Sequence, residues 1–257
     1  MNAILLRRTI GPLAAAGLIV FAVQAAAQQR SCAVAEETFV DEPPLPHAAA
    51  ALTGGRTVTV VAIGGASTQG RAAENPDLAW PQRLAAALVE RFPAARVVAI
   101  NRGVARQTAA DMVGRFKRDV LPARPDLVVW ETGTTDAVRG VDIDAFRDSL
   151  QSGIELLQAA HIELILMDMQ FSQRANAVIN LERYSTVMRD VADANDVAFF
   201  RRHDIMRGWA ESGVFDFDVT DPKKRKAVAA RLYDCIGRAV AALVVHGQHA
   251  AAPAPAE

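Results

Sequence analysis

The sequence predicts one three-layer α/β/α domain built on a five-stranded parallel sheet. Apolar runs of strand length alternate along the chain with longer segments whose apolar residues recur every three or four positions. Strands that are apolar throughout, each separated from the next by a helix, are typical of a parallel sheet covered on both faces. The composition agrees, because 51% of the 257 residues are hydrophobic and a chain of this length can bury one core of ordinary size.

The elements follow one another in a regular order. The strands are expected at residues 57–64, 95–101, 125–133, 162–169 and 196–200. The helices are expected at residues 80–91, 107–120, 142–160, 177–194 and about 222–245. These elements place the domain at residues 56–246, after an irregular lead-in at 28–55 that is rich in Pro, Ala and acidic residues. The Ala- and Pro-rich residues 247–257 are expected to form a disordered tail.

The first 27 residues have the pattern of a secretory signal peptide. Arg7 and Arg8 form a positive region, residues 10–23 an apolar core, and residues 25–27 a small-residue cleavage site. The apolar core is shorter than the roughly 18 residues that cross a bilayer. We therefore expect cleavage after Ala27 and a periplasmic or secreted protein without stable membrane insertion. An uncleaved anchor helix is the alternative.

The charge of the chain argues against two kinds of partner. Lys and Arg number 28 and Asp and Glu 29, so the net charge is −1. A nearly neutral chain has no electrostatic footprint for nucleic acid or for an anionic membrane surface.

Small and polar residues follow the predicted strands. In parallel sheets ligands bind outside the carboxyl ends of the strands, so these residues are expected to share one mouth. They are Ser67 after the first strand, Gly103 after the second, Gly133 and Thr135 after the third, Gln170 after the fourth, and His203 after the fifth. A serine, backbone donors beside glycines and a histidine are what an acyl-transfer site requires. Taken alone, however, Ser67 is also a suitable helix cap and Gly103 an ordinary turn residue.

Three segments carry a resemblance to a known family. They are "AIGGASTQG", "WPQRLAAALVERFPAARVVAINRGVARQTAADM" and "PDLVVWETGTTDA". In order and spacing they resemble the first three conserved blocks of the SGNH, or GDSL-type, esterases and lipases, over roughly residues 57–245. The resemblance implies a flavodoxin-like sandwich, Ser67 as nucleophile and the Gly103 N–H as an oxyanion donor. It also implies action on esters, including acetyl groups of polysaccharides, and no metal or organic cofactor.

The chain departs from the family pattern at three positions. Ala66 stands where the first block usually carries an Asp, which is a mild change because that residue is not the nucleophile. Thr135 stands where the third block carries an oxyanion-donating Asn, and a hydroxyl is shorter than an amide. The last block normally reads Asp-x-x-His, but here the same spacing runs from Asp218 to Asp221 and contains no histidine. A carboxylate of ordinary pKa, near 4, is a poor base toward a serine hydroxyl. Losing one oxyanion donor costs about 10²–10³ in rate.

Three hypotheses follow from the missing histidine. In the first, His203 is the base and is oriented by Asp204 or Asp218. In the second, the domain is a degenerate hydrolase that binds an acylated ligand, such as a glycan, without turning it over. In the third, Asp218 or Asp221 acts through water or with a partner subunit. Outside the family, the same mouth could belong to a periplasmic binding or scaffold module, and Gln170 would then shape its specificity.

The two cysteines predict a disulfide bond. Cys32 follows the signal peptide and Cys235 lies near the end of the chain, and an even pair in an oxidising compartment is usually bridged. Two unrelated buried thiols are the alternative. We predict a Cα separation of roughly 4.4–6.8 Å and no titratable thiol in unfolded, unreduced mature protein. Finding two reactive thiols would show that the bond does not form.

Overall fold

The computed structural model describes residues 34, 38–173 and 177–251. The predicted signal peptide and Cys32 lie outside these residues, so cleavage and the disulfide bond stay predictions. Cys235 itself is fully buried on the last helix. Of the helices in the described part of the chain, none is long and apolar enough to cross a membrane.

The sheet has five parallel strands in the order β2-β1-β3-β4-β5. The strands are β1 (Thr57–Gly64), β2 (Arg96–Gly103), β3 (Leu127–Glu131), β4 (Glu163–Met167) and β5 (Ala198–Phe200). All five fall at the predicted places, and the fold class is confirmed. This order is the flavodoxin-like one, in which β1 and β3 flank the point where the chain switches direction across the sheet. The crevice beyond their carboxyl ends is therefore the expected ligand position.

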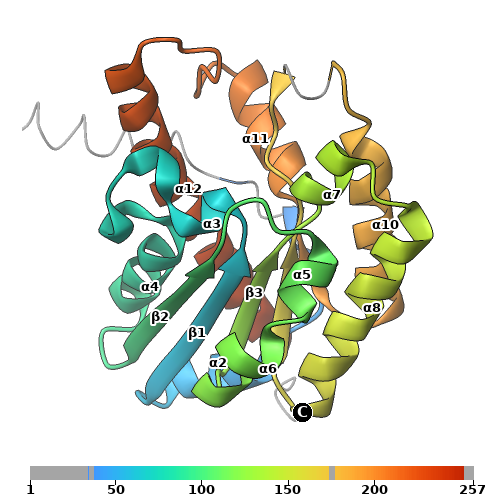
Figure 1. Ribbon diagram of the computed structural model, residues 1–257. Coiled ribbons are helices and arrows are strands. Elements are labelled where there is room, and N and C mark those ends of the chain that lie inside the picture. The colour runs from blue at the N-terminus through green and yellow to red at the C-terminus, as the bar shows by residue number, and fades with distance from the viewer. Residues whose placement is uncertain (1–33, 35–37, 174–176, 252–257) are drawn as a thin grey trace, which may run out of the picture. The chain divides into compact units, whose positions relative to one another are not determined.

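Helices cover both faces of the sheet. They are α2 (Pro46–Thr53), α3 (Ala66–Gln69), α4 (Trp80–Arg91), α5 (Ala109–Val113), α6 (Phe116–Asp119), α7 (Thr134–Arg139), α8 (Ile143–Ala159), α10 (Leu181–Ala194), α11 (Arg202–Glu211) and α12 (Pro222–Ala251). Short 3₁₀ turns occupy Arg71–Ala73, Pro76–Leu78 and Leu121–Ala123. Figure 1 shows α4 and α12 on one side of the sheet and α5, α8 and α10 on the other.

The strands are buried because both of their faces pack against these helices. On the face of α5, α8 and α10, one apolar cluster includes Val61, Val128 and Trp130 from the strands together with Phe116 and Phe146 from the helices. The rings of Phe116 and Trp130 meet edge to face with centroids 5.1 Å apart. A strand buried on both faces reads as a continuous apolar run rather than as an alternating one, which is why the sequence located the strands well.

The predicted lead-in at residues 28–55 is not irregular throughout. Residues 46–53 form α2, which begins at a proline suited to the first helical position. Glu42 is buried just before this helix and accepts a hydrogen bond of 2.6 Å from the Phe199 N–H. Burial raises the pKa of Glu42 above its ordinary value. The composition of the segment suggested a loop, but tertiary packing outweighs composition here.

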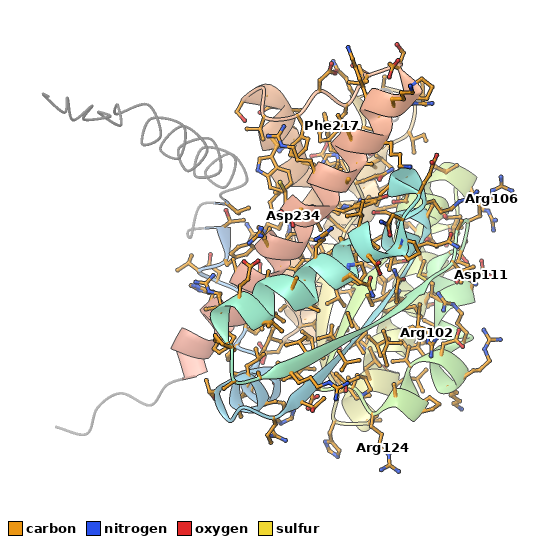
Figure 2. The ribbon with its side chains drawn as sticks, turned by 90° about the vertical axis from the view of Figure 1, so that its left-hand side faces the viewer. Arg102, Arg106, Asp111, Arg124, Phe217 and Asp234 are labelled. Atoms are coloured by element: carbon orange, nitrogen blue, oxygen red, sulfur yellow. The ribbon has the colours of Figure 1, made fainter. Side chains whose placement is uncertain are left out.

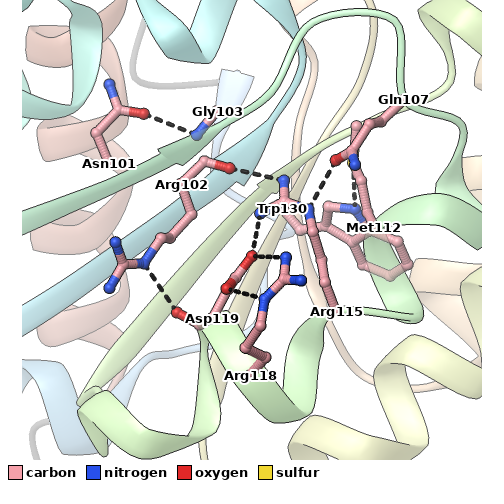
Figure 3. A network of polar contacts seen from close by, with 9 residues as sticks. All are labelled: Asn101, Arg102, Gly103, Gln107, Met112, Arg115, Arg118, Asp119 and Trp130. Carbon is pink, nitrogen blue, oxygen red and sulfur yellow. Dashed lines mark hydrogen bonds and ion pairs between the residues drawn. The ribbon is translucent and has the colours of Figure 1, made fainter.

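The predicted helix at residues 107–120 is interrupted. It forms the two short helices α5 and α6, separated at Gly114 and Arg115. Arg115 is buried, and its guanidinium donates to the Arg102 carbonyl at 2.7 Å, to Gln107 at 2.7 Å and to Asp119 at 3.0 Å (Figure 3). Arg115 thus secures the chain that follows β2. At the other end of the domain, α12 continues to Ala251 and includes the first residues of the predicted tail.

Two glycines let the first loop approach the neighbouring strand. Gly64 and Gly103 are paired at the ends of β1 and β2. A Cβ on Gly103 would lie 2.2 Å from the backbone nitrogen of Gln69, and a Cβ on Gly64 would lie 2.2 Å from the Thr68 hydroxyl oxygen. Only glycine allows α3 to rest directly on the end of β2.

We predict that Gly103→Ala lowers the free energy of unfolding by roughly 1–3 kcal/mol, because backbone atoms must move to admit the methyl group. Gly208→Ala is the matched control. Gly208 is exposed on α11, and a Cβ there meets nothing within 4 Å, so this change should stabilise by about 0.5–1 kcal/mol. Urea unfolding of the three proteins measures both effects. Equal stability of Gly103→Ala and wild type would contradict the packing described.

Candidate active site

Ser67 lies at the carboxyl end of β1, where the sequence predicted it. The strand ends at Gly64, Gly65 precedes α3, and Ser67 is in the first turn of that helix. Its side chain is half-buried. The hydroxyl therefore lies beside the switch point of the sheet, between the ends of β1 and β3, where ligands bind in open α/β sheets.

The hydroxyl of Ser67 is in contact with a buried arginine. The Nη2 of Arg202 donates a hydrogen bond of 2.6 Å to Ser67 Oγ and one of 3.2 Å to Gln170 Oε1. Arg202 is the first residue of α11 and is completely buried. Among the described residues, its Nε and Nη1 have no hydrogen-bond acceptor. The guanidinium therefore reaches Ser67 with spare donor capacity.

Glu131 holds this arginine and the loop of Ser67 together. Its Oε1 lies 3.4 Å from Arg202 Nη1. Its Oε2 accepts hydrogen bonds from the Gly65 N–H at 3.0 Å and from the Thr68 hydroxyl at 2.7 Å. Glu131 is the last residue of β3 and is 4% exposed. These partners, rather than water, therefore stabilise its negative charge. Thr68 is likewise fully buried.

The Gly103 N–H, which the family resemblance implies as an oxyanion donor, has a partner inside the protein. It donates to Asn101 Oδ1 at 2.9 Å (Figure 3). The same carboxamide donates from Nδ2 to the Thr68 carbonyl at 2.6 Å, which ties the end of β2 to α3. Gly103 is thus placed against the loop of Ser67 as expected. Its N–H can serve a ligand only if Asn101 releases it.

His203 lies beside Arg202 on α11, at the mouth as predicted. Consecutive helical residues point about 100° apart, since a turn holds 3.6 residues. The helix turns Arg202 toward Ser67 and directs the His203 ring to the edge of Phe171, with centroids 5.5 Å apart. The Nδ1 of His203 lies 3.6 Å from Asp204 Oδ1, the orienting group suggested by the sequence. The hydrogen bond from His203 is the main cause that lowers the pKa of Asp204.

Asp168 anchors the start of α11. It follows β4, is 1% exposed, and accepts hydrogen bonds from the His203 N–H at 2.9 Å and from the Ser185 hydroxyl at 2.8 Å. Burial raises its pKa to about 6, although both hydrogen bonds act in the opposite direction. Asp168 thereby fixes the segment that carries Arg202 and His203.

The segment after β3 has mainly structural contacts. Gly133 has a φ of +91° and leads into α7, where Thr135 is half-buried in the first turn. Next to it, Asp136 is buried and accepts the Ala109 N–H through both carboxylate oxygens at 3.1 Å. Burial raises the pKa of Asp136. Asp136 therefore joins α7 to the start of α5, and Thr135 is held close to the crevice.

The two aspartates from the last block lie on the surface. Asp218 and Asp221 are both exposed. Asp221 Oδ1 accepts the Lys224 N–H at 2.8 Å, the bond of an N-cap for α12.

An aromatic cluster lies next to these residues. Phe171 contacts Phe217 with centroids 6.3 Å apart, and Phe217 stacks on Phe215 at 5.6 Å. Figure 2 shows Phe217 at the upper end of the molecule, the end toward which the strands run in Figure 1. In the described part of the chain, no three of the His, Cys, Asp and Glu side chains are grouped so that they could hold a metal ion.

Sequence reasoning missed Arg202 and Glu131. A signal for Glu131 was present, because it is a lone carboxylate at the end of the otherwise apolar run "LVVWE". Charged residues are rarely buried unless paired, so this position implied a basic partner at the same end of the sheet. Arg201 and Arg202 at the end of β5 were the available candidates.

Comparison with known proteins agrees with this architecture. The model of a family described as the non-GDSL lipase-like family matches residues 31–250. A catalytic mutant of an acetylxylan esterase from Geobacillus stearothermophilus has a similar fold, with a TM-score of 0.58 and 17% identity over 73% of this chain and 94% of that one. No curated protein matches the sequence.

Two further solved structures share the fold. One is an acetyl xylan esterase, with a TM-score of 0.54 and 20% identity over 68% of this chain and 98% of that one. The other is a two-domain esterase active on acetylated mannans, co-crystallized with mannopentaose. It gives a TM-score of 0.60 and 16% identity over 78% of this chain and 55% of that one.

We predict that Asp168 makes stability depend on pH in the acidic range. Because its folded pKa is raised to about 6, protonation favours the folded state. The free energy of unfolding of wild type should exceed that of Asp168→Asn by the most below about pH 4. This advantage is lost as the pH rises through 6. The pKa difference of about 2 units corresponds to roughly 3 kcal/mol.

Urea unfolding of both proteins between pH 3.5 and 7.5 measures this difference. Asp148→Asn, at an exposed position of α8, is the control and should give a nearly flat difference. The account would be contradicted if the difference in free energy of unfolding between wild type and Asp168→Asn did not change with pH. It would also be contradicted if wild type gained stability over Asp168→Asn as the pH rises.

Proposed function

The chain belongs to the non-GDSL lipase-like family, and we propose that it hydrolyses carboxylic esters with Ser67 as the nucleophile. The observation that carries the proposal is the 2.6 Å hydrogen bond from a fully buried guanidinium to Ser67 Oγ at the switch point of the sheet. A buried cation that donates a hydrogen bond to a serine hydroxyl stabilises negative charge on that oxygen.

The reaction has two steps. Ser67 Oγ attacks the carbonyl carbon of the ester, the bond to the alcohol oxygen breaks, and the alcohol leaves with a proton that replaces the one lost by Ser67. Water then attacks the acyl-serine, releasing the carboxylic acid and restoring the hydroxyl. His203 is the side-chain candidate for moving the proton, since Asp168 and Asp204 hold it at the same mouth.

The substrate we propose is a small ester or an acylated glycan. The structural neighbours described above include esterases for acetylated xylan and mannan, which supports an acetyl ester of a polysaccharide. A neutral glycan also suits a chain of net charge −1. Such a polymer is met outside the cytoplasm, which agrees with the signal peptide proposed for residues 1–27 and with a bond between Cys32 and Cys235.

One observation favours a second candidate, a degenerate domain that binds an acylated ligand without turnover. Ser67 Oγ and the Gly103 N–H, two groups that catalysis requires, each have a partner within the protein. A domain of this kind would hold its ligand at the same crevice and need no base. Activity separates the two candidates.

The test is the hydrolysis of p-nitrophenyl acetate by wild type, Ser67→Ala, His203→Ala and Asp221→His. For a serine esterase, kcat/KM of Ser67→Ala should fall by at least about 10³, to the background rate. If His203 moves the proton, His203→Ala should fall with it, because nucleophile and base act as a unit.

Asp221→His places the missing histidine at the start of α12 and tests whether the surface position can supply a base. Wild-type turnover equal to that of Ser67→Ala would favour the binding domain. Substantial turnover that survives Ser67→Ala unchanged would contradict the proposed mechanism.

A further inference from the structure

We propose that Arg202 is a catalytic residue that stabilises the Ser67 alkoxide, with Glu131 holding its guanidinium in position. This inference rests on the proposed function and adds the group that activates the nucleophile. An arginine side chain has five donors, no acceptor, and keeps its proton in proteins, so Arg202 cannot act as a base. It can only lower the free energy of negative charge on the oxygen to which it donates.

The geometry supports this role. The Nη2–Oγ distance of 2.6 Å is at the short end of charge-assisted hydrogen bonds. Arg202 is completely buried and Ser67 half-buried, so water screens the charge of Arg202 at Ser67 less than it would at the surface. A neutral hydroxyl that accepts this bond still has its proton, and losing that proton strengthens the interaction. The hydrogen bond from Arg202 is therefore stronger when Ser67 is an alkoxide than when it is a neutral hydroxyl.

The ion pair with Glu131 leaves the charge of Arg202 only partly satisfied. The contact from Arg202 Nη1 to Glu131 Oε1 is 3.4 Å, which is longer than a well-formed charged hydrogen bond. The same carboxylate also accepts the Gly65 N–H and the Thr68 hydroxyl. Within the described structure, Nε and Nη1 of Arg202 lack a hydrogen-bond acceptor. The charge of the guanidinium is therefore not fully compensated inside the protein, and Nη2 directs it toward Ser67 Oγ.

Besides Ser67, three groups from three parts of the fold face Arg202. Glu131 contributes from β3, Gln170 from the segment after β4, and Tyr233 from α12 interacts with both Arg202 and Glu131. Burial raises the pKa of Tyr233 above its ordinary value of 10, so its hydroxyl stays neutral below pH 9. Close to this cluster, burial raises the pKa of Asp168 to about 6, and Asp168 accepts the His203 N–H at the start of the helix that carries Arg202.

The experiment measures the rate at which a fluorophosphonate labels Ser67 between pH 6 and 9. In labelling, the bond from Oγ to phosphorus forms, the P–F bond breaks, fluoride leaves, and the serine proton passes to solvent. We expect the wild-type rate to rise with pH as the alkoxide forms. Arg202→Met should label about 10²–10³ times more slowly at each pH, and Arg202→Lys should lose less because it keeps the charge.

A double variant separates the loss of the Arg202 charge at Ser67 from misfolding caused by an unpaired buried charge. Arg202→Met leaves the buried Glu131 without its cation, whereas Arg202→Met with Glu131→Gln removes both charges and leaves a neutral acceptor for Gly65 and Thr68. We expect the double variant to fold and to label as slowly as Arg202→Met. Arg183→Gln, at an exposed position of α10, is the control and should label at the wild-type rate.

The outcomes separate this inference from the proposed function. Labelling of Ser67 that is unchanged in Arg202→Met or in the folded double variant would overturn the role of Arg202 while leaving a serine nucleophile. A pH dependence of the wild-type rate that disappears in His203→Ala but persists in Arg202→Met would assign activation to the imidazole instead. No labelling of wild type at any pH would overturn the proposed function itself.

Discussion

The carboxylate of Glu131 is the constraint on which the site depends. A charge at the buried end of β3 must be balanced where it lies, because solvent cannot reach it. Three groups from two parts of the chain supply the balance: the Gly65 N–H and the Thr68 hydroxyl of the first loop, and the Arg202 guanidinium of α11. The first loop and the start of α11 are thereby fixed to the centre of the sheet. Ser67 acquires its position from this arrangement, since it lies between two of the residues that contact Glu131.

The glycines make this arrangement sterically possible. Gly64 leaves room for the Thr68 hydroxyl to reach Glu131, and Gly103 lets the backbone of Gln69 rest on the end of β2. The small residues after β1 therefore allow the first loop to pack closely and, under the proposed function, place the nucleophile Ser67. Asn101 completes the contact by joining the Gly103 N–H to the Thr68 carbonyl. The same contacts that hold Ser67 in place also occupy the Gly103 N–H, which donates to Asn101.

The sequence predicted the sheet and the position of Ser67 because continuous apolar runs report burial on both faces. It did not predict the partners of Ser67. Whether Arg202 enters the core depends on how α11 is rotated after β5, and Asp168 sets that rotation from a distant part of the chain. The segment at residues 46–53 was missed for a similar reason, since α2 is held by contacts with remote elements rather than by strong local signals. Ion pairs between residues far apart in the sequence depend on the tertiary structure, so a local sequence pattern does not reveal them.

The central claim is that Arg202, held by Glu131, is the group in contact with Ser67 Oγ. A crystal structure of the mature protein with Ser67 phosphonylated tests it most directly, because the adduct places negative oxygens where an ester oxyanion would lie. The account predicts the Arg202 guanidinium within about 3 Å of Oγ or of a phosphonyl oxygen, with Glu131 still facing it. A structure in which Arg202 has turned to solvent and the His203 imidazole donates to the adduct in its place would contradict it.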